Sequence, residues 1–297
     1  MTTTVVLDEG DLLLREAGQL CEGPLWDERD NRLLWVDVPA GAVHATDLGT
    51  GEDRVVLRDS GPVGCVALRA SGGHLVARRS GVAGVEPGWG RCSDLASLPG
   101  QQPRTRTNDG GCDPWGGFWV GTLATDDRPG AGGLWRLEPD GAVRPALDGV
   151  SVSNGLDWSP DGSQMYYVDS PTGRIDLLDL DPDDRSVRSR SPLVSLGLPG
   201  AVPDGLTVDA EGFLWVAVWD GARVRRYDPA GRLDRELLLP VDRVTSIAFG
   251  GPALDVLVVT TAWDGLSPSA RAAQPLAGSL FVHDPGVRGR RAGSWAG

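Results

Sequence analysis

The sequence contains no lysine: all 28 of its strongly basic residues are arginine. Catalysis through a lysine amine is therefore excluded. Histidine occurs only three times, at isolated positions, and the run Gly-x-Ser-x-Gly is absent. These gaps argue against a histidine-rich zinc centre and against a serine nucleophile elbow. We expect His44, His74 and His283 to have structural roles.

Long apolar segments are also missing. No run approaches the roughly 18 apolar residues that a membrane-spanning helix needs, and no basic segment followed by an apolar stretch opens the chain. The four cysteines lie far apart without Cys-x-x-Cys spacing, which favours free thiols over a disulfide framework. The sequence therefore predicts a cytoplasmic protein that has no membrane partner.

Negative charge dominates the chain. The formal net charge is −13 and the isoelectric point is about 4.6. A surface of this kind repels phosphate backbones, so no nucleic-acid partner is expected. Glycine (42) and proline (22) are spread along all 297 residues, as in an all-β chain with many tight turns. Most of the acidic excess is ordinary surface charge, but a few carboxylates could hold a cation.

A short unit repeats along the chain: an apolar strand, a polar turn, and a second strand rich in tryptophan, tyrosine or leucine. The two clearest copies begin at Leu25 and Asp157. The turns recur roughly every 40 to 50 residues, the period of a four-stranded propeller blade. Their marker residues are Asp27, Arg69, Asp113, Ser159, Asp209 and Gly250. Six turns predict an all-β, six-bladed β-propeller, with a pair of β-sandwiches as the structural alternative.

We expect residues 1–297 to form one propeller domain, with blades over roughly 14–285 and a short flexible C-terminal tail. Trp35, Trp119 and Trp215 occupy a similar second-strand phase and should pack between blades. Trp115, Trp219 and Trp263 lie near predicted loops and are candidates for lining a pocket.

The positions five residues before the six turns share one phase. They are Glu22, Gly64, Asn108, Asn154, Asp204 and Thr245. Equivalent positions of innermost strands lie at one height around a propeller axis, so four strongly polar side chains should converge in the channel. Acidic and amide residues beside glycine often only form turns, but turns do not require a shared phase. Carboxylate and amide oxygens suit one divalent cation; we expect Ca²⁺, with Mg²⁺, Mn²⁺ or Zn²⁺ as alternatives.

Four motifs in this order resemble the gluconolactonase / regucalcin (senescence marker protein) family. They are Cys21-Glu-Gly-Pro-Leu-Trp26, Arg106-Thr-Asn-Asp-Gly110, Ser153-Asn-Gly-Leu156 and Pro203-Asp-Gly-Leu206. The resemblance runs from about residue 14 to 285 and implies a propeller lactonase. It implies that Glu22, Asn154 and Asp204 bind the metal, with Asp204 also the general base. Arg106 and Asn108 would contact a small lactone substrate.

The family's acidic residues after a Gly-Thr pair are only partly matched, because Gly121-Thr122 is followed by Asp126 and Asp127. We assign Asp126 to substrate binding on this basis. The expected function is metal-dependent opening of a sugar lactone, such as gluconolactone, by activated water. A phosphotriesterase-like hydrolase and a non-catalytic calcium- or ligand-binding propeller are the alternatives. The sequence leaves open the oligomeric state, the lactone, and whether water or a carboxylate attacks.

Overall fold

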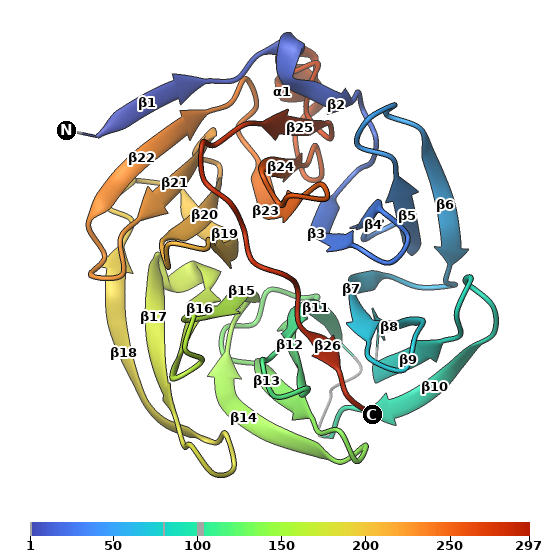
Figure 1. Ribbon diagram of the computed structural model, residues 1–297. Coiled ribbons are helices and arrows are strands. Elements are labelled where there is room, and N and C mark those ends of the chain that lie inside the picture. Colours follow the sequence, from blue (N-terminus) through green and yellow to red (C-terminus); the bar gives the residue numbers. More distant parts are fainter. Residues whose placement is uncertain (1, 80, 100–103) are drawn as a thin grey trace.

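The computed structural model describes residues 2–79, 81–99 and 104–297. Six β-sheets stand around a central channel like the blades of a propeller (Figure 1). Each blade is built on a four-stranded antiparallel sheet whose first strand is innermost. The predicted all-β, six-bladed propeller is confirmed.

The first three blades follow the chain without interruption. Blade 1 contains β3 (Cys21–Asp27), β4 (Arg32–Asp37), β5 (Ala42–Thr46) and β6 (Asp53–Arg58). Blade 2 contains β7 (Val63–Arg69), β8 (His74–Arg78), β9 (Gly81–Val85) and β10 (Cys92–Ser97). Blade 3 contains β11 (Thr105–Cys112), β12 (Phe118–Ala124), β13 (Gly132–Leu137) and β14 (Val143–Val150).

The last three blades complete the ring. Blade 4 contains β15 (Ser153–Trp158), β16 (Gln164–Asp169), β17 (Arg174–Leu180) and β18 (Val187–Ser195). Blade 5 contains β19 (Val202–Val208), β20 (Leu214–Trp219), β21 (Arg223–Tyr227) and β22 (Leu233–Leu238). Blade 6 contains β23 (Val244–Gly250), β24 (Val256–Thr261), β25 (Leu280–His283) and the N-terminal strand β2 (Leu12–Leu14).

The N-terminal residues close the ring. Strand β2 pairs with β25, where Leu12 lies opposite Phe281. Strand β1 (Thr3–Val6) runs parallel to β22 along the outer edge of blade 5. Strand β2 thus completes the last blade, because a ring of sheets needs a non-local pairing to close.

Helix is rare. It comprises α1 (Pro268–Ala273), between β24 and β25, and the 3₁₀ turns η1 (Glu9–Asp11) and η2 (Ser170–Thr172). Among the described residues, no helix has the length and apolar character needed to cross a membrane.

The repeated tryptophans are buried between blades, as predicted. Trp119 and Trp215 are fully buried, and their indole N–H groups donate to Asp113 (2.8 Å) and Asp209 (2.9 Å). The same two carboxylates accept from arginines of the third strand, Arg136 and Arg226. Each buried acid therefore ties a blade's first turn to its second and third strands, which explains the recurrence of these residue types.

The C-terminal segment, residues 286–297, corrects one expectation. It was expected to be a flexible tail, but it crosses the channel axis and ends as β26 (Ser294–Trp295), paired with β7 (Figure 1). Trp295 is only 3% exposed and packs in the core between blades 2 and 3. Burial of this indole and the backbone pairing hold the segment in place.

Polar contacts join the C-terminal segment to the other blades. Gly289 N–H donates to Leu254 O (2.7 Å), and Arg288 O accepts from Ala210 N–H (2.8 Å). Arg290 bonds Asp157 (2.9 Å) and Trp158 O (2.7 Å). These contacts close the channel at the end where the inner strands finish, which we call the closed end. The opposite end, where the inner strands begin, is the site end.

Candidate functional site

The side chains predicted to converge come from equivalent places in the inner strands. In each blade the pairing between the first and second strand shifts register at the predicted position. Such a shift bends the strand and redirects a side chain. Glu22 lies at this shift in β3, Asn108 in β11, Asn154 in β15 and Asp204 in β19.

The two remaining positions of the phase have packing roles. A Cβ atom at Gly64 would collide with the backbone of Asn108, so only glycine fits in β7. The Thr245 hydroxyl in β23 donates to Cys21 O (2.6 Å). Glycine has a similar role at Gly155 and Gly205, where the next inner strand approaches closely. Contact between blades, and not approach to a ligand, requires these glycines.

A chain of hydrogen bonds links blades 3, 4 and 5 at the site end. Arg106 Nη1 donates to Asn108 Oδ1 (2.7 Å), and Asn108 Nδ2 donates to Asn154 Oδ1 (2.6 Å). Asn154 Nδ2 donates to the Ser170 hydroxyl (2.8 Å), which donates to Pro203 O (2.7 Å). The amide group of Asn154 is therefore held in a fixed orientation, with its oxygen toward Asn108 and its nitrogen linked through Ser170 to the residue that precedes Asp204.

The carboxylates of Glu22 and Asp204 are only weakly compensated: Gly23 N–H donates to Glu22 Oε2 (3.2 Å), and the charge of Arg106 acts on both acids. Burial, and then the negative charge of Asp109, raises the pKa of Glu22 to about 8. Burial, and then the charge of Glu22, raises the pKa of Asp204 well above its ordinary value. Asp204 is 4% exposed, and its buried Oδ1 has no hydrogen-bond partner among the described residues. Two buried acids that repel one another form a costly arrangement that a cation would relieve.

These residues fit a divalent cation. Glu22 and Asp204 supply carboxylate oxygens and Asn154 supplies an amide oxygen, the hard ligands that Ca²⁺ and Mg²⁺ prefer. Within the described residues, no three His, Cys, Asp or Glu side chains gather at one point as metal ligands. The candidate set therefore depends on the amide oxygen of Asn154.

Asp109 is a further acidic residue that sequence reasoning did not assign. Its carboxylate accepts from Gly110 N–H (2.7 Å), and burial raises its pKa to about 6. Its charge acts on both Glu22 and Asp204. The signal was present in the run Asn108-Asp-Gly110, since a register shift can turn two consecutive side chains inward.

The predicted substrate residues have different surroundings. Arg106 is recessed, and burial lowers its pKa, whereas the charges of Glu22, Asp264 and Asp204 act in the opposite direction. No ion pair of Arg106 occurs within residues 2–79, 81–99 and 104–297. Asp126 lies on the loop between β12 and β13, where Arg128 Nε (2.9 Å) and Arg104 Nη1 (3.4 Å) pair with it. Its charge is thus already matched.

The histidines and the loop tryptophans have partners of their own. His44 pairs with Asp53 (2.7 Å) and stacks on Trp35, and His74 pairs with Asp27 (2.8 Å) and stacks on Trp89. The predicted structural roles of these two histidines are confirmed. Of the candidate pocket tryptophans, Trp263 lines a hollow beside α1, where Arg271 covers its ring, as predicted. Trp219 lies under Arg243, and Trp115 follows β11 at the closed end.

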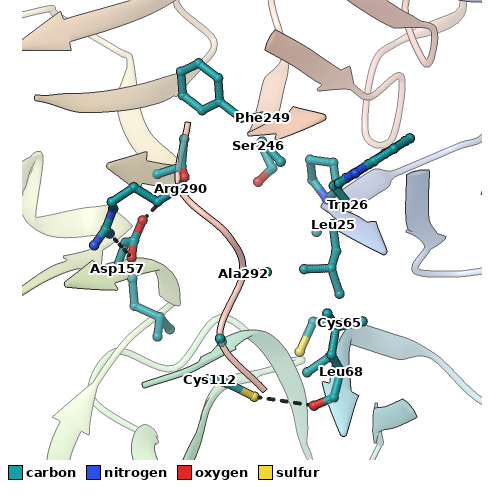
Figure 2. Close-up of a pocket in the computed structure, with 18 of the residues that line it drawn as sticks. Leu25, Trp26, Cys65, Leu68, Cys112, Asp157, Ser246, Phe249, Arg290 and Ala292 are labelled. Atoms are coloured by element: carbon teal, nitrogen blue, oxygen red, sulfur yellow. Dashed lines mark hydrogen bonds and ion pairs between the residues drawn. The ribbon is translucent and has the colours of Figure 1, made fainter. Parts of the chain in front are cut away.

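A hollow lies in the half of the channel toward the closed end. It is a cavity of about 170 Å³, lined by the later residues of the inner strands and capped by residues 290–293. Figure 2 shows Arg290 against Asp157, with Cys65 and Cys112 across the cavity. Asp109 also lines it. Because the C-terminal segment covers this hollow, access to Glu22 and Asp204 is from the site end.

Fold and site together define a six-bladed β-propeller with acidic and amide side chains in its channel. The chain belongs to the SMP-30/gluconolactonase/LRE-like family, whose model matches residues 20–263. Regucalcin of Homo sapiens is 38% identical over 296 residues, covering 97% of this chain and 98% of the relative. Regucalcin of Xenopus laevis is 36% identical over 294 residues, with 97% and 98% covered. The crystal structure of a calcium-binding protein, regucalcin, from Agrobacterium tumefaciens superposes with a TM-score of 0.93 at 27% identity over 99% of each chain.

Proposed function

We propose that this protein is a metal-dependent hydrolase that opens a sugar lactone, with one divalent cation held by Glu22, Asn154 and Asp204. The observation that carries the proposal is a pair of recessed carboxylates whose pKa values are raised by burial and by neighbouring negative charge, with one oxygen of Asp204 lacking a partner among the described residues. Membership of a family that includes gluconolactonases supports the reaction. The calcium-binding regucalcin of A. tumefaciens supports Ca²⁺ as the cation.

A bound divalent cation would polarise the lactone carbonyl and make water easier to deprotonate. Asp204 takes one proton from the water as the water oxygen bonds to the carbonyl carbon, and it returns that proton to the ring oxygen when the carbon–oxygen bond of the ring breaks. The second proton of the water is released to solvent. The product is a hydroxy acid. The new carboxylate carries one negative charge, which the guanidinium of Arg106 can bind, because no acid forms an ion pair with it in the described part of the chain. Asn108, held between Arg106 and Asn154, orients one substrate oxygen.

The test is hydrolysis of gluconolactone, followed by acid release, with protein stripped by EDTA and then reloaded separately with Ca²⁺, Mg²⁺, Mn²⁺ or Zn²⁺. We expect stripped protein to be inactive and reloading to restore turnover. Asp204→Ala should lower kcat at least about 100-fold, the size of a lost general base. Asp148→Asn, which removes one exposed carboxylate of β14, is the matched control.

Full activity after exhaustive chelation and dialysis would refute the metal-dependent reaction. Cation binding by stripped protein, without turnover of any lactone, would instead indicate a binding protein. Turnover of an organophosphate ester with none of a lactone would indicate a phosphotriesterase.

A further inference from the structure

A polar pair, Gln19 and Asp264, lies at the site end. Gln19 precedes β3, and Asp264 lies in the loop between β24 and β25. Gln19 Nε2 donates to Asp264 Oδ1 (2.5 Å). The other carboxylate oxygen, Oδ2, has no partner among the residues that the structure describes, and Asp264 is only partly exposed. One oxygen of a fixed carboxylate is therefore free to accept hydrogen bonds.

The backbone around Asp264 is held firmly. Trp263 N–H and Asp264 N–H both donate to Gln19 O, at 3.0 and 3.1 Å. Arg243 Nη1 donates to Asp264 O, and its Nε pairs with Asp220 (2.9 Å). A carboxylate fixed in this way loses little freedom when it binds a ligand, which is the condition for selective recognition.

The carboxylate of Asp264 interacts electrostatically with Arg106. Its charge is among the largest acting on Arg106, next after that of Glu22. Arg106 in turn bonds Asn108, which reaches Asn154 of the candidate metal set. Gln19 comes just before the start of β3, and Asp264 follows the end of β24, which pairs with the start of β23, so both residues lie at the site end.

Competing acids on the neighbouring loops are already occupied. Asp126 is paired with Arg128 and Arg104, and Asp220 is paired with Arg243. Asp264 has no such cation among the described residues. Of Asp126, Asp220 and Asp264, it is therefore Asp264 that has a carboxylate oxygen available to a ligand. A ligand that binds this oxygen must donate hydrogen bonds and must not carry a net negative charge.

We infer that Gln19 and Asp264 form a hydroxyl-binding subsite that selects polyhydroxylated lactones. The inference rests on the proposed lactonase function. Sugar hydroxyls donate to Asp264 Oδ2, while Gln19 holds the carboxylate in position. A lactone without ring hydroxyls offers no donor there. The pair thus supplies the acidic recognition of sugar that was assigned to Asp126 from the sequence.

The experiment compares D-gluconolactone with δ-valerolactone, which has the same ring size and no hydroxyls. For each, kcat/KM is measured for wild type, Asp264→Asn, Gln19→Ala and the control Asp148→Asn. A charge-assisted hydrogen bond is worth about 10- to 100-fold in binding. We expect Asp264→Asn to lower kcat/KM for gluconolactone by that factor, mainly through KM, and to leave valerolactone within about twofold. Gln19→Ala should have a smaller effect in the same direction.

The outcomes separate the two proposals. If wild type hydrolyses neither lactone, the proposed function fails. If wild type hydrolyses them but Asp264→Asn affects both substrates equally, Asp264 acts only on the charge of Arg106, or on folding, and the subsite is refuted. Unchanged gluconolactone kinetics in Asp264→Asn would also refute it. Melting temperatures of the variants show whether any general loss comes from unfolding.

Discussion

The charge arrangement at Asp204 predicts that a conservative substitution stabilises the protein while destroying its function. Asp204→Asn keeps the shape of the side chain and removes one buried negative charge. In wild type without cation, that charge faces Glu22 and Asp109, and its Oδ1 has no partner. An uncompensated buried polar group costs about 1–3 kcal/mol. We therefore expect metal-free Asp204→Asn to be more stable than metal-free wild type by an amount of this order.

The expected effect is large enough to measure. For a chain of this size, about 1 kcal/mol shifts the melting temperature by roughly 2 °C, so the variant should melt roughly 2–6 °C higher. Cation at about 100 times its Kd would stabilise wild type by about 2.7 kcal/mol. The variant lacks one ligand and should gain little from the same addition. Scanning calorimetry on stripped protein, with and without Ca²⁺, measures both effects.

Asp176→Asn is the matched control, because Asp176 is equally buried but compensated. It pairs with Arg174 and Arg190, each at 2.6 Å. Both arginines are partly exposed, so its removal should destabilise by about 1–3 kcal/mol. Opposite signs for the two substitutions would support the reasoning. If metal-free Asp204→Asn melts below wild type, or if Ca²⁺ stabilises it as much as wild type, the account of this site is wrong.

Two further predictions concern stability. Burial alone would raise the pKa of Asp27, but hydrogen bonds from Arg29 and His74 outweigh it and hold the pKa well below its ordinary value. The contribution of Asp27 to the free energy of unfolding is therefore complete above about pH 4 and is lost as the pH falls below that value. Asp27→Asn should make the free energy of unfolding, measured by urea titration between pH 7 and pH 2, less dependent on pH. An equally steep dependence in the variant would contradict the assignment. Trp295→Ala removes a buried indole from the C-terminal segment and should destabilise by roughly 3–5 kcal/mol, measured by urea unfolding. A loss below about 1 kcal/mol would mean that the segment is not anchored by this residue.

The repeating part of the structure could be predicted from the sequence. Six turns at one period predicted six blades, and the shared phase placed Glu22, Asn108, Asn154 and Asp204 at equivalent register shifts. Both signals are local and repeated, so each copy reinforced the others. Tryptophan burial at Trp119 and Trp215 followed from the same repetition.

Features that break the repetition needed the tertiary structure. The pairing of β2 with β25 and the path of residues 286–297 across the axis join segments that are far apart in sequence. The same holds for Gln19 beside Asp264, 245 positions apart. The charge of Asp126 is matched by Arg128 and Arg104, which belong to no repeated motif. A sequence pattern records what recurs along the chain, whereas the partner of a single side chain is decided only when the ring closes.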